Sequence, residues 1–119
     1  MHLQKGRDGE QLAAELLTTK GYVIAERNYR SGRAEIDLIA WQHDRLLVFV
    51  EVKTRSGEGF GGPEEAVSVA KQKRIVAAAG RYMESIGYDW AVRFDVIAII
   101  LHPGKSPEIR HYEDAFFWM

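Results

Sequence analysis

The chain has 119 residues, of which 46% are hydrophobic and 28% charged, and its formal net charge is -1 at pH 7. These values are typical of one soluble globular domain spanning residues 1–119, and they exclude a disordered or fibrous chain. The sequence has no cysteine, which excludes disulfides, thiolate zinc sites and cysteine nucleophiles, and the lack of a basic surplus argues against a constitutive nucleic-acid binder.

The N-terminal sequence "MHLQKGRDGEQ" lacks the apolar core of a signal peptide. The longest apolar run, residues 96–101, is too short to span a bilayer. We therefore expect a cytoplasmic protein.

The first half of the chain predicts a helix followed by three strands. Over residues 9–20 apolar side chains recur with helical spacing, and Gly21 follows as a stop signal. Residues 22–30, "YVIAERNYR", have the composition of a strand and end at a turn marked by Ser31 and Gly32. The runs "EIDLIAW" and "LLVFVEVK", residues 35–41 and 46–53, are expected to pair as an antiparallel hairpin.

The second half predicts a loop, a helix and one or two strands. Four glycines in "TRSGEGFGGP", residues 54–63, indicate a mobile loop, and a helix is expected from Ser68 to a stop at Gly87. Residues 91–101 form a candidate buried strand, and residues 108–118 a short edge strand with an aromatic tail. The order predicts an α/β fold in which helices flank a mixed sheet, with strand 91–101 parallel to one of the first three strands.

Charged residues end the third strand after an unbroken apolar run. Strand alternation places Glu51 and Lys53 on one face of that strand. On the preceding strand, alternation assigns Glu35, Asp37, Ile39 and Trp41 to one face and Ile36, Leu38 and Ala40 to the other.

The hairpin loop decides whether Asp37 lies opposite Glu51. A loop with an odd number of residues, such as residues 43–45, would place Asp37 opposite Glu51 or its neighbour Phe49. A two-residue turn of His43 and Asp44 would put Asp37 on the other face unless a β-bulge intervenes.

Carboxylates gathered in one small patch repel each other unless a cation neutralises them. Hard, oxygen-rich sites suit Mg²⁺ or Mn²⁺, and Lys53 beside such a site would orient or deprotonate an attacking water. The alternative is that Glu51 and Lys53 are solvated charges at the end of a strand and that Asp37 is an ordinary edge residue.

A family resemblance is carried by four stretches, "GEQLAAELLTTKGYVIAERNYRSGRAEIDLIAW", "LLVFVEVKTR", "FGGPEEAV" and "RFDVIAI". They resemble the bacterial YraN-like family of small proteins, which is placed in the PD-(D/E)-x-K, or restriction-endonuclease-like, superfamily and is similar to archaeal Holliday junction resolvases. The resemblance implies a single nuclease-like domain with a restriction-endonuclease-like core, a Mg²⁺ or Mn²⁺ cofactor and structured or branched DNA as substrate. Because resolvases act on two symmetric strands, it also implies a homodimer.

The resemblance assigns roles to single residues. Asp37 corresponds to the metal-binding aspartate, Glu51 to the second acidic ligand and Lys53 to the catalytic lysine, while the carbonyl of Val52 would be a further ligand. Glu10 matches an acidic position that often completes such sites, and its local alternative is a first-turn acid that complements the helix dipole.

The chain departs from the family pattern at two positions. Ile36 stands where the superfamily name has proline, and Ala34 replaces the glycine usual in the family's "GEIDLI". Neither change removes a ligand. Glu35, between them, is expected to support the ligands or to face solvent.

Basic residues near the predicted loop are candidate nucleic-acid contacts: Arg55, Lys71, Lys73 and Arg74. The alternative for the three helical residues is a solvated helix face, and the resemblance favours a phosphate contact for Lys71. Asp95 is expected to be the structural salt-bridge partner of Arg93.

These patterns lead to the hypothesis of a metal-dependent endonuclease that hydrolyses phosphodiester bonds in structured or branched DNA. The alternatives are a non-catalytic nucleic-acid or protein-binding module that keeps the fold, and a structural partner in a larger complex.

Overall fold

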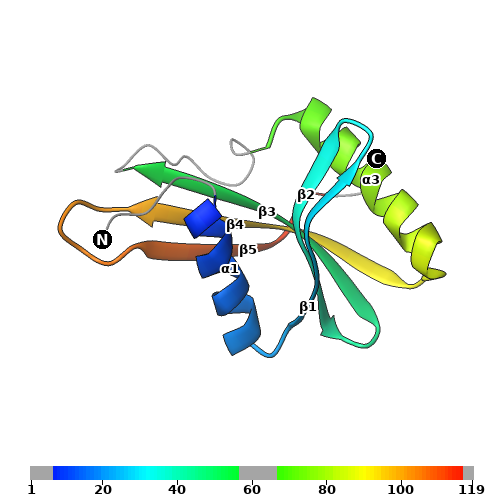
Figure 1. Cartoon of the computed structure of the whole chain (residues 1–119), viewed down its shortest axis with the longest axis horizontal. Coiled ribbons are helices and arrows are strands. Elements are labelled where there is room, and N and C mark those ends of the chain that lie inside the picture. Colours follow the sequence, from blue (N-terminus) through cyan, green and yellow to red (C-terminus); the bar gives the residue numbers. More distant parts are fainter. Residues whose placement is uncertain (1–6, 57–66, 117–119) are drawn as a thin grey trace.

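One twisted sheet organises residues 7–56 and 67–116, the parts of the chain that the computed structural model describes (Figure 1). The elements in chain order are α1 (Arg7–Thr19), β1 (Val23–Ser31), β2 (Ala34–His43), β3 (Leu46–Ser56), α3 (Val69–Ile86), β4 (Ala91–Leu101) and β5 (Glu108–Phe116). The sheet order is β1-β2-β3-β4-β5, and only β3 and β4 run parallel. This arrangement confirms the predicted α/β class, the mixed sheet and the parallel crossover through the second helix.

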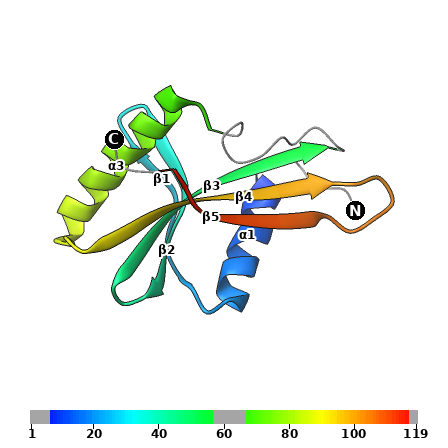
Figure 2. The same ribbon diagram turned by 180° about the vertical axis from the view of Figure 1, so that it is seen from behind.

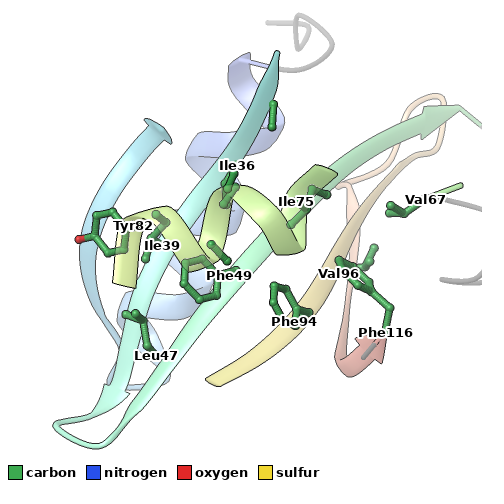
Figure 3. Packing of buried hydrophobic residues seen from close by; sticks show 13 residues of the cluster. Ile36, Ile39, Leu47, Phe49, Val67, Ile75, Tyr82, Phe94, Val96 and Phe116 are labelled. Carbon is green, nitrogen blue, oxygen red and sulfur yellow. The ribbon is translucent and has the colours of Figure 1, made fainter. Parts of the chain in front are cut away.

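The two helices cover opposite faces of the sheet. Figure 1 shows α1 in front of the strands, and the reverse view in Figure 2 shows the strands in front of α1. On the other face, Ile75 and Tyr82 of α3 pack over Ile39 and Phe49 (Figure 3). Because both faces of the central strands are covered, β3 and β4 are apolar over most of their length rather than alternating.

The helix ends follow the signals in the sequence. Ser68 caps α3, with its side chain accepting a hydrogen bond from the backbone N–H of Lys71, and Gly87 ends the helix at a φ of 67°. Gly21, at a φ of 92°, follows α1 as expected. Neither helix in the described part of the chain is long and apolar enough to cross a membrane.

The third strand extends further than its sequence predicts. Thr54, Arg55 and Ser56, assigned above to a loop, continue β3 because they pair in parallel with the end of β4, from Ile99 to Leu101. The available partner strand outweighs the weak strand preference of these residues. The rest of the expected loop, residues 57–63, lies outside the described residues, as does the aromatic tail, residues 117–118.

The hairpin between β2 and β3 resolves the question of register. Its turn consists of Asp44 and Arg45, one residue later than the two-residue turn considered above, and a β-bulge lies between Trp41 and His43. The bulge shifts the alternation, so that Ile39 pairs with Phe49 and Leu38 with Val50. Continued by one position, the same register places Asp37 opposite Glu51.

β2 then separates from β3. Backbone pairing between them ends at Leu38 and Val50, and Figure 1 shows the β1–β2 hairpin turning away from the far half of β3. The assignment of Ile36 to the face of Leu38 is wrong, because Ile36 packs in the core under α3 whereas Leu38 packs in the core under α1. The alternation breaks at Asp37, opposite Asn28, which has a positive φ of 52°.

α1 approaches β3 closely at Gly9, a buried residue in the first turns of the helix. A Cβ at Gly9 would collide with the Oγ1 atom of Thr54 and lie 3.5 Å from Cγ1 of Ile99. Threonine is stiff at χ1, so its hydroxyl cannot simply turn away. The missing side chain at Gly9 therefore fixes how closely the start of α1 rests on the sheet.

We expect Gly9→Ala to lower the free energy of unfolding by about 1–3 kcal/mol, the usual cost of over-packing. Gly80→Ala in α3 is the matched control, because nothing lies within 4 Å of its added Cβ, and it should stabilise the protein slightly. Urea denaturation measures both changes. Adding Thr54→Ala to Gly9→Ala should recover most of the loss, and a double variant as unstable as the single one would contradict this close approach.

Candidate functional site

A cleft of about 230 Å³ lies beside the first turns of α3, at the point where β2 separates from β3. Its lining consists of Arg33, Ala34, Glu35, Asp37, Glu51, Lys71, Arg74 and Ile75. The structure thus brings together two of the predicted metal ligands with two of the predicted nucleic-acid contacts. Lys53 joins them from β3, with its Nζ 3.4 Å from Oε1 of Glu51.

The side chain of Asp37 provides β3 with a hydrogen-bond acceptor that the backbone of a paired strand would otherwise provide. Its Oδ2 accepts a hydrogen bond of 2.7 Å from the backbone N–H of Val52, beyond the last backbone pair between β2 and β3. Burial, together with repulsion from Glu51, raises the pKa of Asp37 to about 7, against the lowering effect of the Val52 N–H. Asp37 is therefore a carboxylate that favours a proton or another cation at neutral pH.

Glu51 is almost fully buried and is contacted by two lysines. Its Oε1 lies 2.5 Å from Nζ of Lys71 and 3.4 Å from Nζ of Lys53. Burial works to lower the pKa of Lys71, but the hydrogen bond and charge of Glu51 outweigh it and raise that pKa. Burial and the neighbouring Lys71 lower the pKa of Lys53, which makes its neutral amine easier to form.

A second acidic group adjoins the cleft. We assign the side-chain amide of Asn28 with its nitrogen facing the carboxylates, because in that orientation it donates to Oε1 of Glu10 at 2.7 Å and to Oε1 of Glu35 at 3.1 Å. Burial raises the pKa of Glu10, and repulsion from Glu35 and Glu51 raises it further. Glu10 thus lies in the first turn of α1, as the dipole interpretation requires, and also within electrostatic reach of the site.

Sequence reasoning missed Asn28. One signal was present, because asparagine is disfavoured in strands but tolerates a positive φ, and Asn28 lies inside a β-type run opposite Asp37. Its positive φ belongs to the same irregularity that breaks the alternation of β2. The backbone of Asn28 thus lies at the irregularity of the hairpin, and its side chain contacts the carboxylates of Glu10 and Glu35.

The predicted nucleic-acid contacts separate into two groups. Arg74 lines the cleft with Lys71, and so does Arg33, which comes from the β1–β2 turn. Lys73 is exposed and is not part of the lining, and the guanidinium of Arg55 donates to the carbonyl of the adjacent Thr54. The cleft itself is thus basic on the side of α3 and the hairpin turn, and acidic at the strands.

The donor set suits a hard divalent ion with few protein ligands. Within residues 7–56 and 67–116, no three His, Cys, Asp or Glu side chains form a group able to hold a metal ion. Mg²⁺, however, usually takes only one or two carboxylates and completes its shell with waters and substrate phosphates. Asp37 and Glu51 fit that pattern because they share a cleft and repel each other.

The carbonyl of Val52 stays a predicted ligand. On the side of β3 that β2 has left, the backbone N–H of Val52 donates to Oδ2 of Asp37, while on the other side Val52 pairs with Ile97 of β4. Because the N–H and the carbonyl belong to the same stretch of backbone, this hydrogen bond fixes Val52 next to the two carboxylates.

Asp95 forms a separate, structural cluster on β4. The predicted salt bridge to Arg93 is confirmed at 2.8 Å, and Asp95 is also bonded to His111 and to the backbone N–H of Asp114. Burial works to raise the pKa of Asp95, but these hydrogen bonds outweigh it and the pKa is lowered. The cluster ties β5 to β4, and through Arg93 it also reaches the hydroxyl of Tyr22.

Comparison with known proteins identifies relatives along most of the chain. Residues 9–99 match the model of the uncharacterised protein family UPF0102. A UPF0102 protein of Rhodococcus jostii is 50% identical over 116 residues, which cover 97% of this chain and 98% of the relative. One from Flavobacterium psychrophilum is 45% identical over 98% of this chain and 96% of its own length. UPF0102 is the YraN-like family, so these matches confirm the predicted resemblance at the level of the family.

The raised pKa of Asp37 has a measurable effect on stability. Folding raises that pKa from 3.8 to about 7, so the folded state binds the proton more tightly. In a metal-free buffer with chelator, this carboxyl should therefore make the free energy of unfolding fall as the pH rises from about 4 to about 7, and no further above. Asp37→Asn keeps an acceptor for the Val52 N–H and should be more stable than the wild type at pH 8, by roughly 1–3 kcal/mol.

Urea denaturation at a series of pH values measures the difference between the two proteins. Asp89→Asn, an exposed residue beyond the end of α3, is the matched control and should keep the wild-type profile. Parallel pH profiles for the wild type and Asp37→Asn would contradict the assignment.

Proposed function

The chain belongs to the uncharacterised protein family UPF0102, and we propose that it is a metal-dependent endonuclease that hydrolyses phosphodiester bonds in structured or branched DNA. One observation carries the proposal. The edge of β3 that is no longer paired with β2 brings together Asp37, Glu51 and Lys53. This edge lies beside a cleft whose other side is lined by basic residues. The resemblance to the PD-(D/E)-x-K superfamily supports the same roles for these three residues.

Mg²⁺ or Mn²⁺ held by Asp37 and Glu51 would neutralise the two carboxylates and polarise the phosphodiester. Lys53 is the candidate general base, because its lowered pKa favours an amine that can accept a proton at Nζ. As this proton leaves the attacking water, the water oxygen bonds to phosphorus and the bond from phosphorus to the sugar oxygen breaks. The leaving oxygen takes a proton from solvent.

The surroundings of the site support a phosphate-bearing substrate. Arg33 and Arg74 line the cleft and can each bind a phosphate oxygen. A net charge of -1 provides little general attraction to DNA, so recognition would depend on this local patch and on the shape of the substrate. The proposal includes a homodimer, which would present two such sites to two symmetric strands, and a cytoplasmic location.

A non-catalytic nucleic-acid or protein-binding module with the same fold is the second candidate. The contact of 2.5 Å between Lys71 and Glu51 favours it, since this contact satisfies the buried Glu51 without any ion. The two candidates differ in one outcome. A binding module would bind DNA in a salt-dependent way and leave every substrate intact.

Cleavage assays test the proposal directly. With Mg²⁺ or Mn²⁺, we expect the wild type to cut labelled four-way junction or flap DNA faster than duplex or single-stranded DNA. Asp37→Ala should abolish cleavage, and Lys53→Ala should slow it by about 10²- to 10⁴-fold, the usual contribution of a general base.

Lys105→Ala is the matched control for the lysine, because Lys105 is exposed in the turn after β4, away from the cleft. Cleavage that survives both Asp37→Ala and Lys53→Ala would remove these residues from the mechanism. Binding without cleavage of any substrate would favour the binding module.

A further inference from the structure

The ammonium of Lys71 contacts Glu51, one of the two carboxylates proposed to hold the metal ion. Lys71 lies in the first turn of α3, and its Nζ is 2.5 Å from Oε1 of Glu51, closer than the 3.4 Å of Lys53. Glu51 is 5% exposed, so its negative charge needs a cation beside it. Lys71 supplies that cation from an element other than the strand that carries Glu51.

The two lysines that contact Glu51 differ in their freedom to move. Lys53 lies on β3 itself and its side chain is 19% exposed, whereas that of Lys71 is 34% exposed. The backbone of Lys71 is anchored, because its N–H donates to the cap residue Ser68. Its four-carbon side chain can still move its ammonium group without a change in the helix.

A divalent ion and the ammonium of Lys71 compete for the same carboxylate. Two cations on one oxygen repel each other strongly in a partly buried site. Lys71 and Arg74 are three residues apart, hence on the same side of α3, and both line the cleft. An ammonium released from Glu51 therefore has a second anionic partner within reach whenever a phosphate occupies the cleft.

We propose that Lys71 is an exchangeable counter-ion: it neutralises Glu51 in the metal-free protein, a divalent ion displaces it, and the freed ammonium then binds a substrate phosphate beside Arg74. This inference rests on the proposed metal-dependent function and adds a coupling between its two ligands. Binding of the metal improves binding of the phosphate, and by linkage binding of the phosphate improves binding of the metal to the same extent.

Manganese titration by calorimetry, without DNA, tests the first half of the inference. Lys71→Gln removes the positive charge that competes with the ion, and it should bind Mn²⁺ about fivefold more tightly than the wild type or better, the equivalent of roughly 1 kcal/mol for a lost ion pair. Lys71→Arg keeps the charge and should bind Mn²⁺ close to wild-type affinity. Lys105→Gln, at an exposed residue in the turn after β4 and outside the cleft, is the matched control and should change the affinity less than twofold.

Fluorescence anisotropy with a short thymidine oligonucleotide, with and without Ca²⁺ in place of the hydrolytic metal, tests the second half. Ca²⁺ should tighten oligonucleotide binding to the wild type, and this gain should be smaller for Lys71→Gln than for Lys105→Gln. Thermal unfolding of each variant verifies that it is folded, and Lys71→Met provides a second neutral variant if Lys71→Gln is not.

The outcomes separate this inference from the proposed function. Mn²⁺ that binds the wild type, is lost in Asp37→Asn and binds Lys71→Gln no more tightly would overturn the role of Lys71 alone. If neither the wild type nor Lys71→Gln binds Mn²⁺, the metal-dependent function fails, and the exchange fails with it.

Discussion

The separation of β2 from β3 at Asp37 is the feature on which the site depends. Beyond Leu38 and Val50 the two strands no longer pair, and the carboxylate of Asp37 accepts the hydrogen bond of the Val52 N–H instead. Glu51 and Lys53 lie on the part of β3 that keeps β4 as a neighbour but has lost β2. An edge that would present unpaired backbone groups becomes one wall of a cleft lined with charges.

Two aspartates, the buried Asp95 and the half-buried Asp37, show how the surroundings separate a structural carboxylate from a candidate ligand. Asp95 accepts hydrogen bonds from a guanidinium, an imidazole and a backbone N–H, and its pKa is lowered despite full burial. Asp37 accepts one backbone N–H and faces Glu51, and its pKa is raised to about 7. The first carboxylate is already neutralised by the fold, whereas the second still favours a cation.

The sequence predicts the helices and strands better than the contacts between them. Apolar periodicity and the glycine signals locate both helices, and the long crossover predicts that β4 runs parallel to one of the first three strands, which in the structure is β3. Which residue of β3 lies opposite Asp37 depends on the β-bulge between Trp41 and His43. No turn motif in the sequence marks this bulge. The contact of Lys71 with Glu51 could not be predicted either, because it depends on where the first turn of α3 lies against the sheet. The sequence predicts that Asp37 lies opposite Glu51 only if the hairpin has an odd loop or a β-bulge. The structure has the bulge, and its register, continued one position beyond the last backbone pair, puts Asp37 opposite Glu51.

The metal site can be observed in a crystal soaked with Mn²⁺ and measured at a wavelength where manganese scatters anomalously. We predict an anomalous peak between the carboxylates of Asp37 and Glu51, with the ammonium of Lys71 no longer in contact with Glu51. An empty cleft at saturating Mn²⁺, with Lys71 still bound to Glu51, would contradict this prediction.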